Sequence, residues 1–478
     1  MQLSHYNETE FKQNDTINPV IKFLDNISEV TKTYGSFEKA ERAIKILVNE
    51  LESSLLKETL SQYDINVKML KKGDKIYHQV LREEKTYKTS AGEISIYRSL
   101  FRASGEKKSI CPLELQAGII NGSWTPTAAR LGLYVTAQLT PYQGAKLFKE
   151  FGSFKPSKTS LDTLARKLGS CWDDHLDDFN NKLYEEIVIP ETAITMSASL
   201  DGIMIPLNKK ASNGYEIEET TEITQDATEK KKPFYKEASC ASISFYDNEG
   251  ERLSTVRFGR MPEEGKKTLK KTLSQAIQQA CGERPELKIV KIADGAKDNW
   301  NYLSKELQPG KGIEILDYYH ASDHLNDAFE AAYGKGNADA IAQYKKYRSL
   351  LKNEENGVEK VINTLRYLHK KHPQSEKILT ELNYFRNNKH RMIYAEAKQL
   401  KLPIGSGVIE ASCKTLITQR MKCAGMRWDI KGGQGILTAR GLIQSNLFDK
   451  GWKLISQCFV DKFEMLADNI IPIRCVGI

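Results

Sequence analysis

The sequence predicts a multidomain α+β protein, in which an α/β core with a mixed five-stranded sheet is interrupted by an all-helical insertion and preceded by a mainly helical region. Three observations predict this fold class. Residues 37–63 and 125–168 carry apolar side chains at helical spacing. Strand-like and helical patterns then alternate over residues 194–318. Residues 323–399 are charged and almost wholly helical in pattern, without a strand signal.

The N-terminal part is expected to contain a long amphipathic helix followed by a β-hairpin. The apolar positions of the helix are Ile44, Leu47, Leu51 and Leu55. The hairpin is predicted over residues 85–101, because residues 88–92 form a turn and Ile94 and Ile96 alternate with polar residues. We therefore assign residues 1–84 to an N-terminal helical region and 85–185 to a DNA-binding region.

Two prolines mark helix starts in the DNA-binding region. Pro126 and Pro141 each follow a threonine, the pattern of proline in the first helical turn. Residues 141–151 and 157–168 read as two helices joined by a glycine-containing turn, which is the outline of a helix-turn-helix. The recognition helix would then present Ser157, Lys158 and Thr159 to DNA. An αα-hairpin buried in the fold explains the same pattern equally well.

After Pro190 the pattern becomes strand-like. Strands are predicted at 194–200, 238–246, 252–258, 287–293 and 312–318, and helices at 265–281 and 300–307. The turn at 247–250 makes the second and third strands a hairpin, and the polar residues 213–232 are expected to form an exposed loop or ragged hairpin. Strand, hairpin, helix, strand, helix, strand is the order of the RNase H-like fold. The core is assigned to 186–325, the insertion to 326–400, and the last core helix and a basic region to 401–478.

Two aspartates follow predicted strands of this core. Asp201 comes after the first strand and Asp294 after the fourth, and each precedes a glycine. These two strands are neighbours in an RNase H-like sheet, so both carboxylates reach one site. Two metal ions about 3.5–4 Å apart, held by converging carboxylates, can balance the charge that develops when a phosphodiester is cleaved. The alternative for either residue is an Asp-Gly turn that ends a strand.

The third acidic candidate is Glu410, in the first turn of the helix that follows Ser406 and Gly407. A glutamate there also complements the helix dipole and can pair with Lys414, so spacing leaves both interpretations open. Asp317 and His320 close the last strand. We expect them to support the site, hydrogen-bonding each other or capping the next helix, instead of taking part directly.

A basic stretch near the C-terminus is a candidate DNA-backbone surface. It contains Lys414, Arg420, Lys422, Arg427, Lys431 and Arg440, together with Trp428. A solvated basic face is the alternative interpretation.

Composition limits the function classes. The 70 Lys and Arg exceed the 62 Asp and Glu, and a net charge of +8 fits a nucleic-acid partner. No apolar run reaches the roughly 18 residues that span a bilayer, and the polar start has no signal-peptide pattern. The eight cysteines include no C-x-x-C pair, which argues against a zinc ribbon and favours a reducing cytosol. Residues 265–268 lack the spacing of a Walker motif, so an ATPase is not expected.

Four short blocks resemble those of bacterial insertion-sequence DDE transposases of the ISKra group. The blocks are Leu200-Asp-Gly202, Ala293-Asp-Gly-Ala-Lys-Asp-Asn-Trp300, Asp317-Tyr-Tyr-His-Ala-Ser-Asp-His324 and Gly405-Ser-Gly-Val-Ile-Glu-Ala-Ser-Cys-Lys414. The resemblance extends from about residue 87 to 452. It implies an RNase H-like catalytic domain with a helical insertion before its last acidic residue. It also implies that Asp201, Asp294 and Glu410 are the metal ligands, and it matches Asp317 and His320 to an Asp-x-x-His signature.

The resemblance implies a reaction and partners. Two Mg²⁺ (or Mn²⁺) ions would activate water to nick the element's end, and the released 3′ hydroxyl would attack target DNA. The partners would be terminal inverted repeats and target DNA, bound by at least a dimer in the bacterial cytoplasm on the nucleoid, without a membrane. Two alternatives stay open: another RNase H-like nuclease, such as a resolvase or repair enzyme, and a domesticated or inactive transposase-derived DNA-binding protein.

Overall fold

The computed structural model describes residues 18–33, 36–152, 154–208 and 234–463. The chain separates into two compact units, one formed by Met1–Asp174 with Trp452–Ile478 and the other by His175–Gly451. The residues after 451 therefore group with the N-terminal unit, whereas the sequence assigned them to the catalytic core. Within the described ranges, no helix has both the length and the apolar character needed to cross a membrane.

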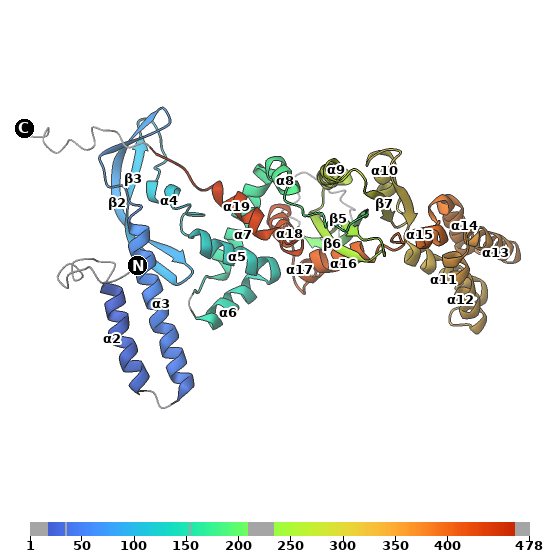
Figure 1. Cartoon of the computed structure of the whole chain (residues 1–478), viewed down its shortest axis with the longest axis horizontal. Helices are drawn as coiled ribbons and strands as arrows, with labels where there is room; N and C mark the ends of the chain where they lie inside the picture. The colour runs from blue at the N-terminus through green and yellow to red at the C-terminus, as the bar shows by residue number, and fades with distance from the viewer. Residues whose placement is uncertain (1–17, 34–35, 153, 209–233, 464–478) are drawn as a thin grey trace, which may run out of the picture. The chain divides into compact units, whose positions relative to one another are not determined.

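The N-terminal unit begins with two helices that lie side by side, α2 (Asn18–Thr33) and α3 (Phe37–Ser61) (Figure 1). Ser36 caps α3 by accepting a hydrogen bond from the Lys39 amide at 3.4 Å. Near its end, Leu60 packs in a buried cluster with Tyr87 and Ile94 of the following sheet. The long helix predicted over 37–63 is thus confirmed.

A three-stranded antiparallel sheet follows, made of β1 (Met69–Lys72), β2 (Lys75–Thr89) and β3 (Gly92–Ala103). The predicted hairpin turn is confirmed, because Thr89 pairs with Gly92. The expected boundary between residues 84 and 85 is wrong, since it falls inside β2. Residues 75–84 are mostly polar and exposed, so this half of the strand has no apolar alternation to reveal it.

The helices predicted after the hairpin are present as α5 (Pro126–Gln138), α6 (Pro141–Phe151) and α7 (Lys158–Asp174). A short helix, α4 (Pro112–Gln116), precedes them. Proline opens α5 and α6 as expected, and Thr140 and Gln143 form a capping box at α6. Gly152, at φ 86°, ends α6 in the left-handed conformation that glycine adopts without strain. Both α5 and α6 pack against α7.

The second unit contains α8 (Leu176–Tyr184) and a mixed sheet of five strands in the order β6-β5-β4-β7-β8. The strands are β4 (Thr195–Leu207), β5 (Phe234–Tyr246), β6 (Arg252–Arg260), β7 (Lys288–Ala293) and β8 (Ile313–Leu316). Strands β4, β5 and β6 are antiparallel, and β7 and β8 run parallel to β4. This is the predicted order. The predicted loop at 213–232 lies outside the described residues.

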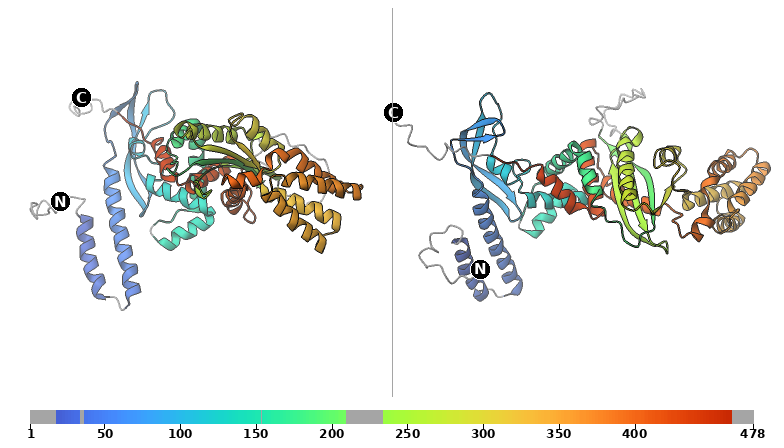
Figure 2. Two further views of the ribbon diagram at one scale, coloured as in Figure 1. Left: turned by 45° about the vertical axis from the view of Figure 1, so that its right-hand side comes forward. Right: turned by 45° about the horizontal axis from the view of Figure 1, so that its top comes forward.

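Helices cover both faces of this sheet (Figure 2). Helix α9 (Lys267–Glu283) lies over one face, and α16 (Gly407–Ser412) and α18 (Ile430–Gln444) lie over the other. The central strands are accordingly buried on both sides: residues 195–200 of β4 and 238–246 of β5 are all buried. Helix α10 (Lys297–Lys305) connects β7 to β8.

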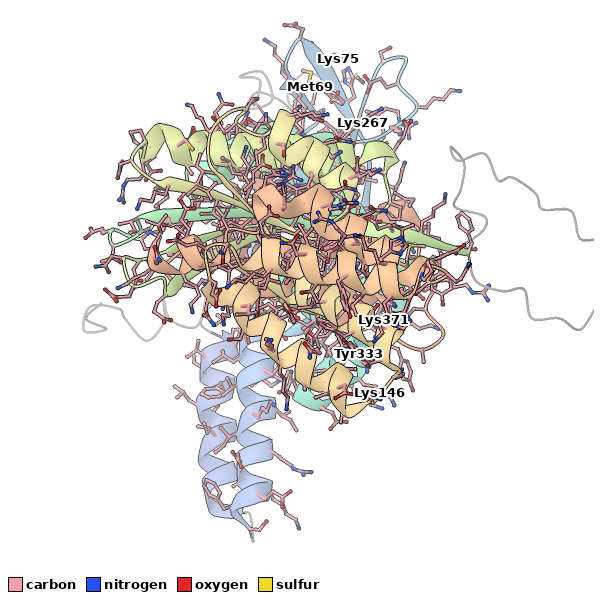
Figure 3. All side chains as sticks on the ribbon, turned by 90° about the vertical axis from the view of Figure 1, so that its right-hand side faces the viewer. Met69, Lys75, Lys146, Lys267, Tyr333 and Lys371 are labelled. Carbon is pink, nitrogen blue, oxygen red and sulfur yellow. The ribbon has the colours of Figure 1, made fainter. Side chains whose placement is uncertain are left out.

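The predicted all-helical insertion is confirmed as α11 to α15, and we keep the term "insertion" for these helices. They are α11 (Tyr318–Tyr333), α12 (Ala338–Asn353), α13 (Gly357–Lys371), α14 (Glu376–Asn388) and α15 (Tyr394–Gln399). Figure 3 turns the insertion toward the viewer, with Tyr333 at the end of α11 and Lys371 at the end of α13. The expected boundary at 325/326 falls inside α11, because this helix starts directly after β8.

A buried carboxylate holds the insertion together. Glu381 of α14 is 1 % exposed, and it lies 2.6 Å from His324 Nδ1 of α11 and 2.9 Å from Lys377 Nζ. Burial raises the pKa of Glu381, but the hydrogen bonds from His324 and Lys377 outweigh it, so the pKa lies below its ordinary value of 4.5. The ionised form therefore stabilises the folded insertion.

We expect Glu381→Gln to lower the free energy of unfolding by about 1–2 kcal/mol at pH 7, the scale of a hydrogen bond to a charged group. Because the folded-state pKa is depressed, this stability is present above the ordinary pKa of 4.5 and is lost as the pH falls below it. Chemical denaturation at pH 7 and pH 3.5 should show a difference that shrinks at the lower pH. An equal difference at both values would contradict the pairing.

Candidate metal centre

Two aspartates lie level with each other, Asp201 within β4 and Asp294 directly after the adjacent parallel strand β7. Ser199 of β4 pairs with Ile292 of β7, so two residues further along Asp201 stands beside Asp294. Burial raises the pKa of Asp201, and the negative charge of Asp294 raises it further. Two carboxylates are thus brought together in a position where a bound cation would favour the ionised form of Asp201.

The expectation that Asp201 ends its strand is wrong. Strand β4 continues through Asp201 to Leu207 and stays paired with β5 along this length. The extension is stable because Ile205 and Leu207 are buried, and because Trp428 adds a backbone bridge to the end of β4. Asp294, by contrast, directly follows the last residue of β7, as predicted.

Asp294 is held by the start of α10. Its Oδ1 accepts hydrogen bonds from the Ala296 amide at 3.1 Å and from Asn299 Nδ2 at 3.2 Å. The Trp300 indole donates to the Asp294 carbonyl at 2.5 Å. The sequence did not single out Asn299 and Trp300, although both lie in the block that begins at Ala293. Their contacts fix the Asp294 carboxylate against the sheet.

Glu410 lies in the first turn of α16, the helix that packs against β4 and β5. Its Oε1 accepts from Ser406 Oγ at 3.1 Å and lies 3.6 Å from His320 Nε2. About half of the side chain is exposed, at 49 %. The carboxylates of Asp201, Asp294 and Glu410 do not all approach one another within 4.8 Å.

A cysteine connects the helix of Glu410 to Asp201. Cys413 follows Glu410 by three residues and donates its thiol to Asp201 Oδ2 at 3.7 Å. Hydrogen bonding to Cys240, followed by burial and the charge of Asp201, raises the pKa of Cys413, so the thiol keeps its proton. Cys240 stands opposite Asp201 on β5. No sequence pattern indicates this pair, because buried cysteines are usually ordinary small apolar residues.

Asp317 joins three elements behind the site. It is fully buried, and its Oδ1 accepts from the His320 amide at 2.7 Å, which confirms the predicted cap of α11. Its Oδ2 accepts from the Ser406 amide, just before α16. The Asp317 amide in turn donates to the Ala293 carbonyl at 2.9 Å, at the end of β7. Asp317 therefore fixes the loop that leads to Glu410 relative to the strand that leads to Asp294.

The predicted recognition-helix residues lie at the exposed start of α7. Ser157 caps this helix by accepting from the Ser160 amide at 3.1 Å. The side chains of Ser157, Lys158 and Thr159 are all exposed. The positive end of the helix dipole and the lysine are thus accessible to a phosphate.

The basic C-terminal stretch divides into exposed and buried residues. Lys414, Lys422, Arg427 and Lys431 are exposed. Arg420 and Arg440 are only 2 % and 3 % exposed, so the expectation that they belong to a surface stretch is wrong. Arg440 donates to the carbonyls of Leu416 and Thr415, in a π-helical segment, Cys413–Thr418.

Arg420 and Trp428 have structural contacts of their own. The Arg420 guanidinium lies 5.0 Å from the centre of the Trp428 ring. The partly buried Trp428 donates from its indole to the Met421 carbonyl at 3.0 Å, and its amide donates to Pro206 of β4 at 3.0 Å. These contacts anchor the segment after α17 (Gln419–Met421) to the sheet. The sequence alone does not distinguish Arg420 and Trp428 from the exposed lysines of the same stretch.

Comparison with known proteins gives a distant likeness to solved structures alone. No protein-family model matches the chain, and no curated protein matches it. Among solved structures, the chain is similar to the Drosophila P element transposase strand transfer complex, with a TM-score of 0.27 and 11 % sequence identity. The similarity covers 73 % of this chain and 85 % of that one. A likeness of this size assigns neither a family nor a site.

Proposed function

We propose that this chain is a DNA transposase that cleaves DNA at element ends and transfers the strand into target DNA. The observation that carries the proposal is the position of Asp201 on β4 beside Asp294 at the end of the parallel strand β7, with the helix of Glu410 anchored to Asp201 through Cys413. Support also comes from the helical insertion between Asp294 and Glu410 and from the resemblance of the motif blocks to ISKra transposases.

The donor set of the proposed centre fits two Mg²⁺ or Mn²⁺ ions. Carboxylate oxygens are the ligands that these hard cations prefer, and Asp201, Asp294 and Glu410 supply them from three elements. When bound, the ions would activate the attacking oxygen and offset charge on the leaving oxygen. Asn299 holds the Asp294 carboxylate at 3.2 Å, and Ser406 holds that of Glu410 at 3.1 Å. Two of the three ligands are therefore oriented by hydrogen bonds before any ion arrives.

Exposed polar and basic residues are proposed to contact the DNA. In the second unit these are Lys414, Lys422, Arg427 and Lys431, of which Lys414 lies one turn after Glu410 in the same helical stretch. In the first unit, Ser157, Lys158 and Thr159 at the start of α7 are proposed to read or position the inverted repeats. Joining two element ends to one target requires at least two copies of the chain on DNA.

The proposal is tested by incubating the protein with DNA that carries the gene's own flanking sequence, in Mg²⁺ or Mn²⁺. We expect cleavage at the border, a free 3′ hydroxyl, and joining of that end to a second duplex. Glu410→Gln should remove both steps. Glu396→Gln is the matched control, because Glu396 is an exposed glutamate in the first turn of α15.

Three other outcomes would contradict the proposal. Cleavage without preference for the border sequence would favour another RNase H-like nuclease. Binding of the border sequence without any cleavage would favour an inactive, transposase-derived DNA-binding protein. Equal loss of activity in Glu410→Gln and Glu396→Gln would remove Glu410 from the proposed centre.

A further inference from the structure

A lysine that the metal-centre proposal does not use contacts Asn299, the residue that holds Asp294. Lys266 precedes α9 in the loop after β6. Its Nζ lies 3.4 Å from Asn299 Oδ1, and Asn299 Nδ2 donates to Asp294 at 3.2 Å. One ammonium group thus contacts Asn299, which in turn holds the Asp294 carboxylate.

The backbone at this lysine is strained. Gly265 and Lys266 have φ values of 63° and 54°, so two consecutive residues are left-handed, and the second is not glycine. Such a conformation costs a non-glycine residue on the order of 1–3 kcal/mol and persists only where neighbouring contacts fix it. Here the loop is fixed on both sides: Met261 donates to Gln434 Oε1 at 2.9 Å, and Leu269 donates to Glu263 Oε1 at 2.9 Å.

The partner of Lys266 in the folded chain is Glu237 of β5, 2.7 Å away. The lysine side chain is 17 % exposed and that of Glu237 is 44 % exposed. An ion pair with one partner this accessible contributes about 0.2–1 kcal/mol, less than the strain of the left-handed backbone. The pair alone therefore does not explain why the lysine is held here. Glu237 can also be replaced by another anion, because water reaches its carboxylate.

Glu237 marks the position that such an anion would take. Its carboxylate lies over Gly202, where a Cβ atom would be only about 2.1 Å from Glu237 Oε1. Gly202 directly follows Asp201 on β4, and successive residues of a strand face opposite sides of the sheet, so this anion lies across β4 from the Asp201 side chain. Its link to the candidate metal centre is through Lys266 and Asn299 to Asp294. A DNA phosphate bound there would meet a fixed positive charge in a region otherwise dominated by carboxylates. Lysine is suited to this role as a compact point charge.

We propose that Lys266 binds a non-bridging phosphate oxygen of the DNA strand held at the metal centre, with the phosphate replacing Glu237 as its partner. This inference rests on the proposed function, since it places substrate DNA at Asp201 and Asp294. It predicts that Lys266 and Glu237, the two members of one ion pair, have different roles in DNA binding. Loss of Lys266 removes a DNA contact, whereas loss of the Glu237 charge removes only a competitor.

The test compares Lys266→Met with Glu237→Gln, which break the same ion pair from opposite sides. DNA binding is measured over a range of salt concentrations, in Ca²⁺, on a duplex with the flanking sequence. Lys266→Met should reduce the slope of log Kobs against log salt by about 0.9, the contribution of one phosphate contact. It should also slow Mg²⁺-dependent cleavage by about 100- to 1000-fold, the effect of removing one preorganised group that stabilises the transition state. Glu237→Gln should leave the salt slope and the cleavage rate within about twofold of the wild-type values, because an exposed ion pair contributes little free energy.

Two further variants control for charge and folding. Lys267→Met removes the same charge one residue away, from an exposed lysine at the start of α9, and should change neither the slope nor the cleavage rate (Figure 3). Lys266→Arg keeps the charge and should keep the slope. Thermal unfolding of each variant shows whether the loop still folds, and Lys266→Gln replaces Lys266→Met if the latter does not.

The outcomes separate this inference from the proposed function. Equal effects of Lys266→Met and Glu237→Gln, or an unchanged slope in Lys266→Met, would overturn the phosphate contact. If wild type cleaves and Lys266→Met cleaves equally fast, the inference fails while the proposed function stands. If wild type does not cleave but Lys266→Met still reduces the slope, the phosphate contact stands while the proposed reaction fails.

Discussion

Asp201→Asn is expected to lower metal-dependent DNA cleavage by at least about 10³-fold, because each 1.36 kcal/mol of lost transition-state stabilisation costs a factor of ten and a bound cation supplies several kcal/mol. Asn keeps the shape of the side chain but removes the charge that would share a cation with Asp294. The cleavage rate is measured on the flanking-sequence DNA in saturating Mg²⁺. DNA binding should stay within about threefold, since DNA affinity comes mainly from phosphate contacts by basic residues elsewhere.

The control for this variant is Asp298→Asn. Asp298 is an exposed carboxylate on α10, four residues after Asp294, and it pairs with Lys270 at 3.3 Å. The same chemical change there should leave cleavage unaffected, since the residue has no part in the proposed centre. Unchanged cleavage in Asp201→Asn, or equal losses in the two variants, would remove Asp201 from the list of metal ligands.

Asp317→Ala is expected to have the largest effect on stability, lowering the free energy of unfolding by about 2–4 kcal/mol. The substitution removes the cap of α11 and leaves the amides of His320 and Ser406 without their acceptor. Ser406 is buried, so water cannot easily replace the lost bond. Chemical denaturation measures the loss. Cleavage should also fall in the folded variant, because the loop before Glu410 loses its attachment to α11.

Two variants bracket this effect. Asp317→Asn keeps one acceptor oxygen and should lose less stability than Asp317→Ala. His320→Ala removes a side chain that is 44 % exposed and should change stability by under about 0.5 kcal/mol, as is usual for surface substitutions. A stability of Asp317→Ala within that same range would show that the buried carboxylate does not join α11 to the loop before Glu410.

The strand order could be predicted because local signals agree with one another. The turn at 247–250 is an example: Asp247 Oδ1 accepts from the amides of Glu249 and Glu251, and Gly250 takes a positive φ of 81°. With this turn in place, the apolar strands and amphipathic helices on either side of it can form only a few sheet topologies. The neighbouring positions of Asp201 and Asp294 follow from that order alone, because β4 and β7 are paired in parallel.

Features that depend on distant partners were not predictable. The end of β4 is set by Trp428, which is far away in sequence, and not by the Asp-Gly pair. In the sequence, Arg420 and Arg440 look like the exposed basic residues around them. In the structure Arg440 is buried against the π-helical segment, and Arg420 is buried against the indole ring of Trp428. Asn299, Cys413 and Lys266 acquire their positions near the aspartates only through tertiary contacts. Single-residue patterns contain no information on such contacts.

The central claim is that Asp201, Asp294 and Glu410 hold two divalent cations. Its most direct test is a titration with Mn²⁺ in the presence of bound DNA, in which electron paramagnetic resonance measures the free ion. We predict two tightly bound ions per chain in wild type and in Asp298→Asn, and the loss of at least one in Asp201→Asn. The same number of ions, bound with the same affinity, in wild type and Asp201→Asn would contradict the claim.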